Sequence, residues 1–400
     1  MVLIAICERR IRIFDTTLRD GDQMAGVELS LEDKIEIAKA LDELGVDIIE
    51  AGFPISSKID LETIKAVSRE LSKSKIAALA RASKRDIDEA AASDAQVIHV
   101  FIATSDIHLK YKLRLTREDV LSKITEAVEY AKEYGALVLF SAEDATRSDR
   151  EFLVKAYMEA VNAGSKYINI PDTVGVATPW EMRDLVSYVR SKLPRHVWID
   201  VHCHNDFGMA TANSLAGVLG GADGVQVTVN GFGERAGNAA LEEVVAALHF
   251  LMNYRTNIVL EKLTSVSKFV AKKFGINLQP NKPIIGINAF AHEAGIHVHG
   301  VLSNPATYEA IAPEDVGNRR RIVLGRHSGR HAVIWALERM SIKPTHQLVN
   351  FILHKLKEVA PKTKKVSEDQ IKKWIEEFNK FKGVIYYASN TCNTRRWNRS

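Results

Sequence analysis

Residues 13–23 read Ile-Phe-Asp-Thr-Thr-Leu-Arg-Asp-Gly-Asp-Gln, a short apolar run that ends in threonine, arginine, carboxylates and glutamine. Inward-facing side chains at the carboxyl end of a buried strand meet at the mouth of a parallel barrel, where barrel enzymes have their active sites. The stretch is therefore typical of a strand that delivers Arg19 and Asp20 to a site. Asp-Gly is also a common turn dipeptide, so this stretch alone leaves a plain turn equally open.

Short β-rich runs alternate with helical patterns from residue 11 to about residue 250, which is typical of βα units around a parallel sheet. Eight such units match a (β/α)8 TIM barrel, which takes about 250 residues. A doubly wound sheet is the alternative, but no GxGxxG motif follows the first strand. A helix is expected from Leu31 to Leu44, with Ser30 as its N-cap. The predicted strands are Arg12–Asp15, Asp47–Ala51, Ile76–Ala80, Val97–Ile102, Leu137–Phe140, Tyr167–Ile170, Trp198–His202 and Gly224–Val229.

Composition and charge exclude several classes of protein. The chain has 400 residues, 46% of them hydrophobic, which is enough for one large α/β domain with a smaller appendage and excludes a wholly disordered chain. Its formal net charge is only +4, so we expect no nucleic acid as a partner. Cys7, Cys203 and Cys392 match no zinc or redox spacing, which is typical of a reducing compartment. No apolar run reaches about 18 residues and no signal peptide is recognisable, so we expect no membrane insertion and predict a cytoplasmic protein.

The sequence pattern changes after Asn257, where helical segments flank a loop rich in proline and glycine at residues 279–286 and a histidine-dense segment. We therefore predict a TIM-barrel domain at residues 1–257 and a C-terminal, mainly helical appendage at residues 258–388. A Ser-Glu-Asp start and spaced apolar residues predict an amphipathic helix from Ser367 to Phe381. Residues 389–400 are polar, and we expect them to form a disordered tail.

Two histidines stand at the end of the seventh predicted strand, in the sequence Val-His-Cys-His-Asn-Asp at residues 201–206. Because strand side chains alternate between faces, His202 and His204 point the same way and Cys203 points oppositely. A lone His-x-His pair is often incidental. With Asp20 at the same mouth, however, it becomes a 2-His-1-carboxylate set with open positions, which is a metal-binding pattern. The glycine-rich loop at residues 230–239 could add an oxygen ligand through Asn238, or it could bind phosphate, as loops at that place in barrels often do.

Three ordered motifs occur in the chain: Asp-Thr-Thr-Leu-Arg-Asp-Gly at residues 15–21, His-Cys-His-Asn-Asp at residues 202–206 and Gly-Phe-Gly-Glu-Arg-Ala-Gly-Asn-Ala at residues 231–239. Together they resemble the 2-isopropylmalate synthase, homocitrate synthase and citramalate synthase family of metal-dependent TIM barrels. The resemblance covers residue 11 to about residue 380. It implies an acyl transfer in which acetyl-CoA loses a methyl proton, the enolate attacks the ketone of a 2-oxo acid, and the thioester is hydrolysed.

The resemblance implies a divalent cation, Mg, Mn or Zn, held by Asp20, His202, His204 and Asn238. Such a cation would chelate the 2-oxo acid through its carbonyl and carboxylate and act as a Lewis acid and a template. Arg19 directly precedes Asp20 in the sequence, and a fixed guanidinium at that place stabilises charge that develops on the ketone oxygen. The alternative for Arg19 is a structural ion pair with a neighbouring carboxylate.

The same resemblance assigns roles to five further side chains. Glu143 assists proton transfer, and Thr173 hydrogen-bonds the substrate carboxylate. Arg147 is a candidate for substrate binding, although its position equally fits an exposed helix start. In the histidine-dense segment, His297 matches a catalytic histidine that works with the barrel glutamate and reaches in from the neighbouring subunit of a homodimer. Tyr308 matches a tyrosine that assists in the same place.

Two features indicate which member of the family this chain resembles most. Residues 19–22 read Arg-Asp-Gly-Asp, and residues 101–110, at the end of the fourth strand and after it, contain no arginine, which resembles the isopropylmalate and citramalate branches. We predict a 2-isopropylmalate synthase of leucine biosynthesis that uses 3-methyl-2-oxobutanoate, with citramalate synthase (pyruvate) and homocitrate synthase (2-oxoglutarate, lysine biosynthesis) as alternatives. The chain ends near residue 400, where many isopropylmalate synthases begin a regulatory domain, so we expect none. A retro-aldol lyase would lack the appendage, and a non-catalytic relative would have lost Arg19, Glu143 or His297.

Overall fold

The computed structural model describes residues 9–359 and 366–393. The chain forms two compact units, Met1–Gln279 with Pro283–Ile285, and Pro280–Lys282 with Gly286–Ser400. Across the described ranges, no helix has the length and apolar character that a bilayer span requires.

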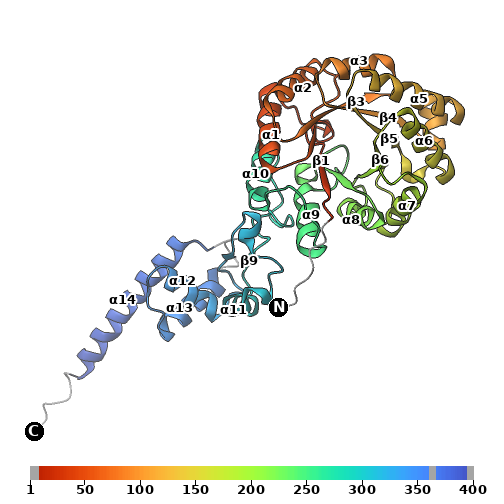
Figure 1. Cartoon of the computed structure of the whole chain (residues 1–400). Coiled ribbons are helices and arrows are strands. Elements are labelled where there is room, and N and C mark those ends of the chain that lie inside the picture. Colours follow the sequence, from red (N-terminus) through yellow and green to blue (C-terminus); the bar gives the residue numbers. More distant parts are fainter. Residues whose placement is uncertain (1–8, 360–365, 394–400) are drawn as a thin grey trace, which may run out of the picture. The chain divides into compact units, whose positions relative to one another are not determined.

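Eight parallel strands form a closed barrel in sequence order, which confirms the predicted (β/α)8 fold (Figure 1). The barrel closes because β1 pairs with β2 on one side and with β8 on the other, where Arg12 lies opposite Gly224. The strands are β1 (Arg12–Asp15), β2 (Ile48–Glu50), β3 (Lys75–Arg81), β4 (Val97–Ala103), β5 (Leu137–Glu143), β6 (Tyr167–Asp172), β7 (Trp198–Cys203) and β8 (Gly224–Val227).

Helices surround the strands and connect each strand to the next (Figure 1). The first begins at Leu31 as predicted, because the Ser30 hydroxyl accepts a hydrogen bond from the Asp33 backbone N–H at 3.1 Å and the Asp33 carboxylate accepts one from Ser30 in return. The helices are α1 (Leu31–Leu44), α2 (Lys58–Glu70), α3 (Lys84–Ala92), α4 (Asp106–His108), α5 (Arg117–Glu133), α6 (Arg150–Ala163), α7 (Pro179–Lys192), α8 (Ala210–Gly220) and α9 (Leu241–Ala246).

The barrel interior has an apolar layer followed by a polar layer. Phe14, Ile48, Ala77, Val97 and Leu139 form one core cluster inside the first five strands. Since alternate residues of a strand share a face, the residues two positions further along β2 to β5 lie on the same inner face, nearer the carboxyl ends. They are Glu50, Leu79, His99 and Ser141, and all four are buried. The apolar layer therefore forms a floor beneath the mouth of the barrel.

The barrel unit continues beyond Asn257, where we predicted the domain boundary, to Gln279. The extra segment contains α10 (Leu263–Lys273), which is tied to α1. The Lys273 ammonium lies 2.8 Å from Asp33 and 2.7 Å from Glu36. The rings of Phe232 and Phe274 also stack, with centroids 4.9 Å apart.

Helices dominate the second unit, as predicted for the appendage. A core of its own includes Val333, Leu337, Ile352 and Trp374. The last helix continues past Phe381, where we predicted its end, and past residue 389, where we expected a disordered tail; residues 394–400 lie outside the described residues. The elements are β9 (Ala291–His292), α11 (Gly295–Ser303), β10 (Arg321–Ile322), α12 (Arg330–Arg339), α13 (His346–Val359) and α14 (Glu368–Asn393).

Candidate active site

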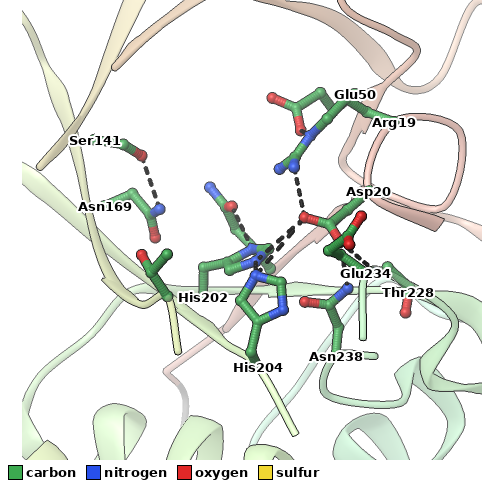
Figure 2. A network of polar contacts seen from close by, with 12 residues as sticks. Arg19, Asp20, Glu50, Ser141, Asn169, His202, His204, Thr228, Glu234 and Asn238 are labelled. Carbon is green, nitrogen blue, oxygen red and sulfur yellow. Dashed lines mark hydrogen bonds and ion pairs between the residues drawn. The ribbon is translucent and has the colours of Figure 1, made fainter. Parts of the chain in front are cut away.

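Asp20, His202 and His204 meet at the carboxyl ends of the barrel strands (Figure 2). Asp20 follows β1, whereas His202 lies in β7 and His204 directly follows it, with their ring centroids 4.9 Å apart. The two Nε2 atoms are 3.2 Å apart and lie 3.7 and 3.9 Å from Oδ2 of Asp20. All three side chains are buried, and one ligand atom from each lies within 4.8 Å of the others.

The protonation states at this site favour a bound cation. Burial lowers the pKa of His202 to about 3, so its ring is neutral. Nδ1 of His202 lies 3.0 Å from Oε1 of Gln226, and a neutral ring that donates there keeps a lone pair on Nε2. Although burial favours the neutral acid, Arg19 and the two histidines hold the pKa of Asp20 well below its usual range. A carboxylate and imidazole nitrogens that converge in this way are the donor set of a divalent metal.

Asn238, which we predicted as an oxygen ligand, makes a different contact. Its amide nitrogen donates to Oδ1 of Asp20 at 2.9 Å and to the carbonyl of Phe232 at 3.2 Å. Its Oδ1 and Nδ1 of His204 are buried, and neither has a hydrogen-bond partner among the described residues. The structure thus places Asn238 against the carboxylate, where it orients Asp20, and leaves two buried polar atoms beside the candidate metal site.

Arg19 is held by two carboxylates at the edge of the same site (Figure 2). Its Nε lies 2.5 Å from Oε2 of Glu50, and its Nη1 lies 2.5 Å from Oδ2 of Asp20. Glu50 also contacts Nδ1 of His99 at 2.5 Å. Burial disfavours the charge of Glu50, but Arg19 and His99 hold the pKa of this carboxyl group well below its usual range. The guanidinium is therefore fixed between two ionised groups.

The polar contacts continue across the barrel from His99 to β6. Nε2 of His99 lies 2.6 Å from the Ser141 hydroxyl, which accepts a hydrogen bond from the Asn169 amide at 2.8 Å. We did not predict Glu50, His99, Ser141 or Asn169 as site residues. The sequence did contain a signal, because each is a polar side chain inside or at the end of a strand that is otherwise largely apolar.

A cavity of about 260 Å³ opens at this mouth. The proposed ligands Asp20, His202 and His204 line it together with Arg19, Glu143 and Thr173, so the structure brings six of the predicted residues to one cavity. Polar and charged side chains that we did not predict also line it: Gln23, His99, Lys112, Ser141, Asn169 and Gln226. The apolar part of the wall consists of Phe53, Leu79, Phe101 and Pro171.

Glu143 and Thr173 enter the cavity from neighbouring strands. Oε1 of Glu143, at the end of β5, lies 2.5 Å from the Lys112 ammonium, which stands on a π-helical turn (Leu109–Leu113) after β4. The Thr173 hydroxyl accepts a hydrogen bond from the backbone N–H of Asp144 at 2.9 Å. Because its oxygen is already an acceptor there, the hydroxyl proton of Thr173 is free to point to a ligand.

The other predicted residues lie elsewhere. Arg147 does not line the cavity; its Nε donates to both oxygens of Asp144, at 2.9 and 3.0 Å. His297 and Tyr308 belong to the second unit, where their rings pack with centroids 4.3 Å apart. Gly300 leaves room for Tyr308, because a Cβ atom at position 300 would lie only 2.6 Å from the tyrosine ring. Both side chains are exposed on that unit.

Comparisons with known proteins cover both units. The HMGL-like family model matches residues 10–270, and the homocitrate synthase post-HMGL domain-like model matches residues 284–364. The chain is 52% identical over 369 residues to a probable 2-isopropylmalate synthase of Ignicoccus hospitalis, covering 92% of each chain. It is 52% identical over 358 residues to the (R)-citramalate synthase of Methanocaldococcus jannaschii, covering 90% of this chain and 72% of that one.

Solved structures resemble the barrel. An HMG-CoA lyase of Bacillus subtilis gives a TM-score of 0.61 with 23% identity, covering 68% of this chain and 95% of the lyase. At that identity the likeness extends to the fold alone.

Proposed function

Because this chain belongs to the HMGL-like family, in the group of relatives named 2-isopropylmalate synthase, we propose that its barrel condenses acetyl-CoA with 3-methyl-2-oxobutanoate to give 2-isopropylmalate. The observation that carries this proposal is the 52% identity that extends over 92% of both chains. Citramalate synthase is the second candidate, since one such enzyme is also 52% identical. The reaction forms a bond between the methyl carbon of acetyl-CoA and the ketone carbon, and water then cleaves the thioester and releases CoA.

Asp20, His202 and His204 are the proposed ligands of a divalent cation, which we expect to be Mg, Mn or Zn. Their buried, converging donor atoms and the lone pair on Nε2 of His202 support this assignment. Asn238 either orients Asp20 through its amide nitrogen or, after rotation of the amide, adds its unpaired Oδ1. A divalent cation at such a site polarises a carbonyl and orients a 2-oxo acid.

The remaining cavity residues have roles that follow from their contacts. Arg19 stabilises the negative charge on the ketone oxygen, because its guanidinium is fixed by Glu50 and needs no reorganisation during the reaction. Thr173 donates its hydroxyl proton to the substrate carboxylate. Glu143 takes the methyl proton of acetyl-CoA, working with His297 of the partner subunit.

The cavity predicts which 2-oxo acid is preferred. The apolar residues Leu79, Phe101 and Pro171 accommodate a branched alkyl group, whereas a second buried carboxylate would need a free cation. Arg19 and Lys112 are already paired with carboxylates. We expect kcat/KM to be highest for 3-methyl-2-oxobutanoate, exceeding that for pyruvate by at least about tenfold, because each missing methyl group costs roughly 1–3 kcal/mol in an apolar pocket.

A panel assay of CoA release with 3-methyl-2-oxobutanoate, pyruvate and 2-oxoglutarate tests this order. A higher kcat/KM for 2-oxoglutarate would make the enzyme a homocitrate synthase, and a higher value for pyruvate would make it a citramalate synthase. As a matched variant, Leu79→Phe reduces the apolar space and should lower kcat/KM for 3-methyl-2-oxobutanoate more than for pyruvate.

We further propose that the active enzyme is a homodimer in which His297 and Tyr308 of the partner subunit complete each barrel. Their exposure on the second unit supports this arrangement, since neither is committed to that unit's core. Mixing a His297→Ala chain with an Arg19→Ala chain should restore activity, because each heterodimer then contains one intact site. With free exchange of subunits, about a quarter of the wild-type sites should be intact.

The control for this experiment mixes two chains whose single substitutions both lie in the second unit. A mixture of His297→Ala and Tyr308→Phe chains forms heterodimers in which every site has one altered residue, so it should recover no activity beyond that of the Tyr308→Phe enzyme. If the first mixture also fails to recover despite demonstrated exchange, the site is not shared between subunits.

A further inference from the structure

Asp144 lies at the centre of a polar cluster that connects three loops of the barrel mouth. It directly follows Glu143 and is completely buried. Its backbone is left-handed, with φ 64° and ψ 38°. Among residues other than glycine, asparagine and aspartate tolerate this conformation best, while others adopt it at a cost. The strained turn therefore needs contacts that hold it in place.

The Asp144 carboxylate makes those contacts on both sides. It accepts a hydrogen bond from the Ser105 hydroxyl, just before α4, and its Oδ2 lies 2.9 Å from Nδ1 of His108, the last residue of α4. It also accepts from Nε of Arg147, in the 3-10 turn after β5. A buried carboxylate that accepts from a hydroxyl on one side and from a guanidinium on the other is strongly anchored, because removing either donor leaves part of a buried polar group unsatisfied.

The backbone of Asp144 reaches the third loop. Its N–H donates to the Thr173 hydroxyl at 2.9 Å, immediately after β6. This bond fixes the Thr173 oxygen as an acceptor and directs its proton away from Asp144, and Thr173 lines the cavity. The direction of the N–H depends on the left-handed turn, so the orientation of the hydroxyl depends on the same turn.

We propose that Asp144 is a positioning residue whose left-handed turn, anchored by its buried carboxylate, orients the Thr173 hydroxyl toward the carboxylate of the 2-oxo acid. The proposal rests on the substrate-binding role proposed above for Thr173. It also explains why Arg147 does not reach the cavity, since its guanidinium is part of the anchor.

Three variants at Asp144 and Thr173 test the proposal. Asp144→Ala disfavours the turn and removes the anchor, so KM for the 2-oxo acid should rise about tenfold, as expected for the loss of one well-placed hydrogen bond. KM for acetyl-CoA should change less than about twofold. Asp144→Asn keeps the turn accessible and should raise KM for the 2-oxo acid by less than about threefold. Thr173→Val should raise that KM by about as much as Asp144→Ala.

The double variant separates positioning from a general loss of structure. If Asp144 acts through Thr173, adding Asp144→Ala to Thr173→Val should raise KM for the 2-oxo acid by less than a further twofold or so. A full additional rise in the double variant would overturn the proposal. Equal effects of Asp144→Asn and Asp144→Ala would overturn it as well, because asparagine keeps both the left-handed turn and a side-chain oxygen that accepts at the anchor.

Asp86 provides a matched control. It is also a buried aspartate that accepts hydrogen bonds from an arginine and a serine, Arg81 at 2.7 Å and Ser83 at 2.8 Å, but it does not line the cavity. Asp86→Asn should leave both KM values within about twofold of the wild type. If Asp144→Ala does not fold, Asp144→Gly takes its place with the same expected rise, because glycine permits the turn but does not anchor it.

The proposed role of Thr173 and the proposal for Asp144 fail in different ways. If Thr173→Val leaves KM for the 2-oxo acid unchanged, the role of Thr173 is wrong and the proposal for Asp144 falls with it. If Thr173→Val raises that KM and Asp144→Ala does not, Thr173 keeps its role and the proposal for Asp144 alone is refuted.

Discussion

Replacing His202 by alanine should abolish binding of the divalent cation and lower kcat by more than about a hundredfold, because even outer-shell partners of a metal site cost 10- to 100-fold when removed. His202 presents Nε2 to the site, 3.7 Å from Oδ2 of Asp20, while Gln226 fixes its Nδ1. Alanine removes this donor and leaves the neighbouring strands paired. Metal content, kcat and the thermal midpoint should be measured on the same preparation.

The wild-type enzyme provides the complementary measurement. Stripping it with a chelator should cause a comparable loss, and added divalent metal should restore activity in the wild type but not in His202→Ala. Cys203→Ala is the matched control, since this buried side chain lies between the two histidines on the opposite face of the strand. It should lower stability without changing metal content. Full turnover by stripped enzyme would contradict the metal site.

Replacing Arg19 by lysine should lower kcat by about a hundredfold to a thousandfold, which is the loss that follows removal of one fixed donor to a developing oxyanion. Arg19 is only 12% exposed, and two different nitrogens of its guanidinium contact Glu50 and Asp20. A lysine keeps the charge but cannot reproduce the planar fork that makes these contacts. We expect KM for the 2-oxo acid to change less than kcat, because the charge on the ketone oxygen develops in the transition state.

Arg12 on the same strand gives a matched control. It is 9% exposed, pairs with the buried Asp200, and lies at the start of β1, away from the mouth. Arg12→Lys should lower the thermal midpoint and leave kcat within about twofold of the wild type. An Arg19→Lys enzyme with wild-type kcat would remove Arg19 from the proposed mechanism.

The sequence predicted the barrel well because its signals are local. Each strand is a short apolar run between helical segments, and α1 is marked by the capping box of Ser30 and Asp33. His202 and His204 could be placed on one face because strand side chains alternate. Asp20 could be placed beside them because the first and seventh strands of a parallel barrel end at the same mouth.

Other parts of the site depend on contacts that no local pattern contains. The pairing of Lys112 with Glu143 requires a π-helical turn that brings an ammonium back over the next strand. Asp144 adopts a left-handed turn, and no glycine at that position indicates the turn in the sequence. Glu50 and His99 meet only because β2 and β4 both point these residues into the barrel. The boundary after Asn257 was misplaced because α10 has the helical pattern of the appendage although it packs on the barrel.

The separate hydrophobic cores of the two units, one inside the barrel and one among α12, α13 and α14, mean that the chain has at least two folding units whose cooperativity need not coincide. A calorimetric scan then contains the unfolding enthalpy of each unit, and a single free energy of unfolding does not describe the chain. Since the proposed reaction needs residues from both, the less stable unit sets the temperature at which turnover is lost, whichever unit carries a substitution.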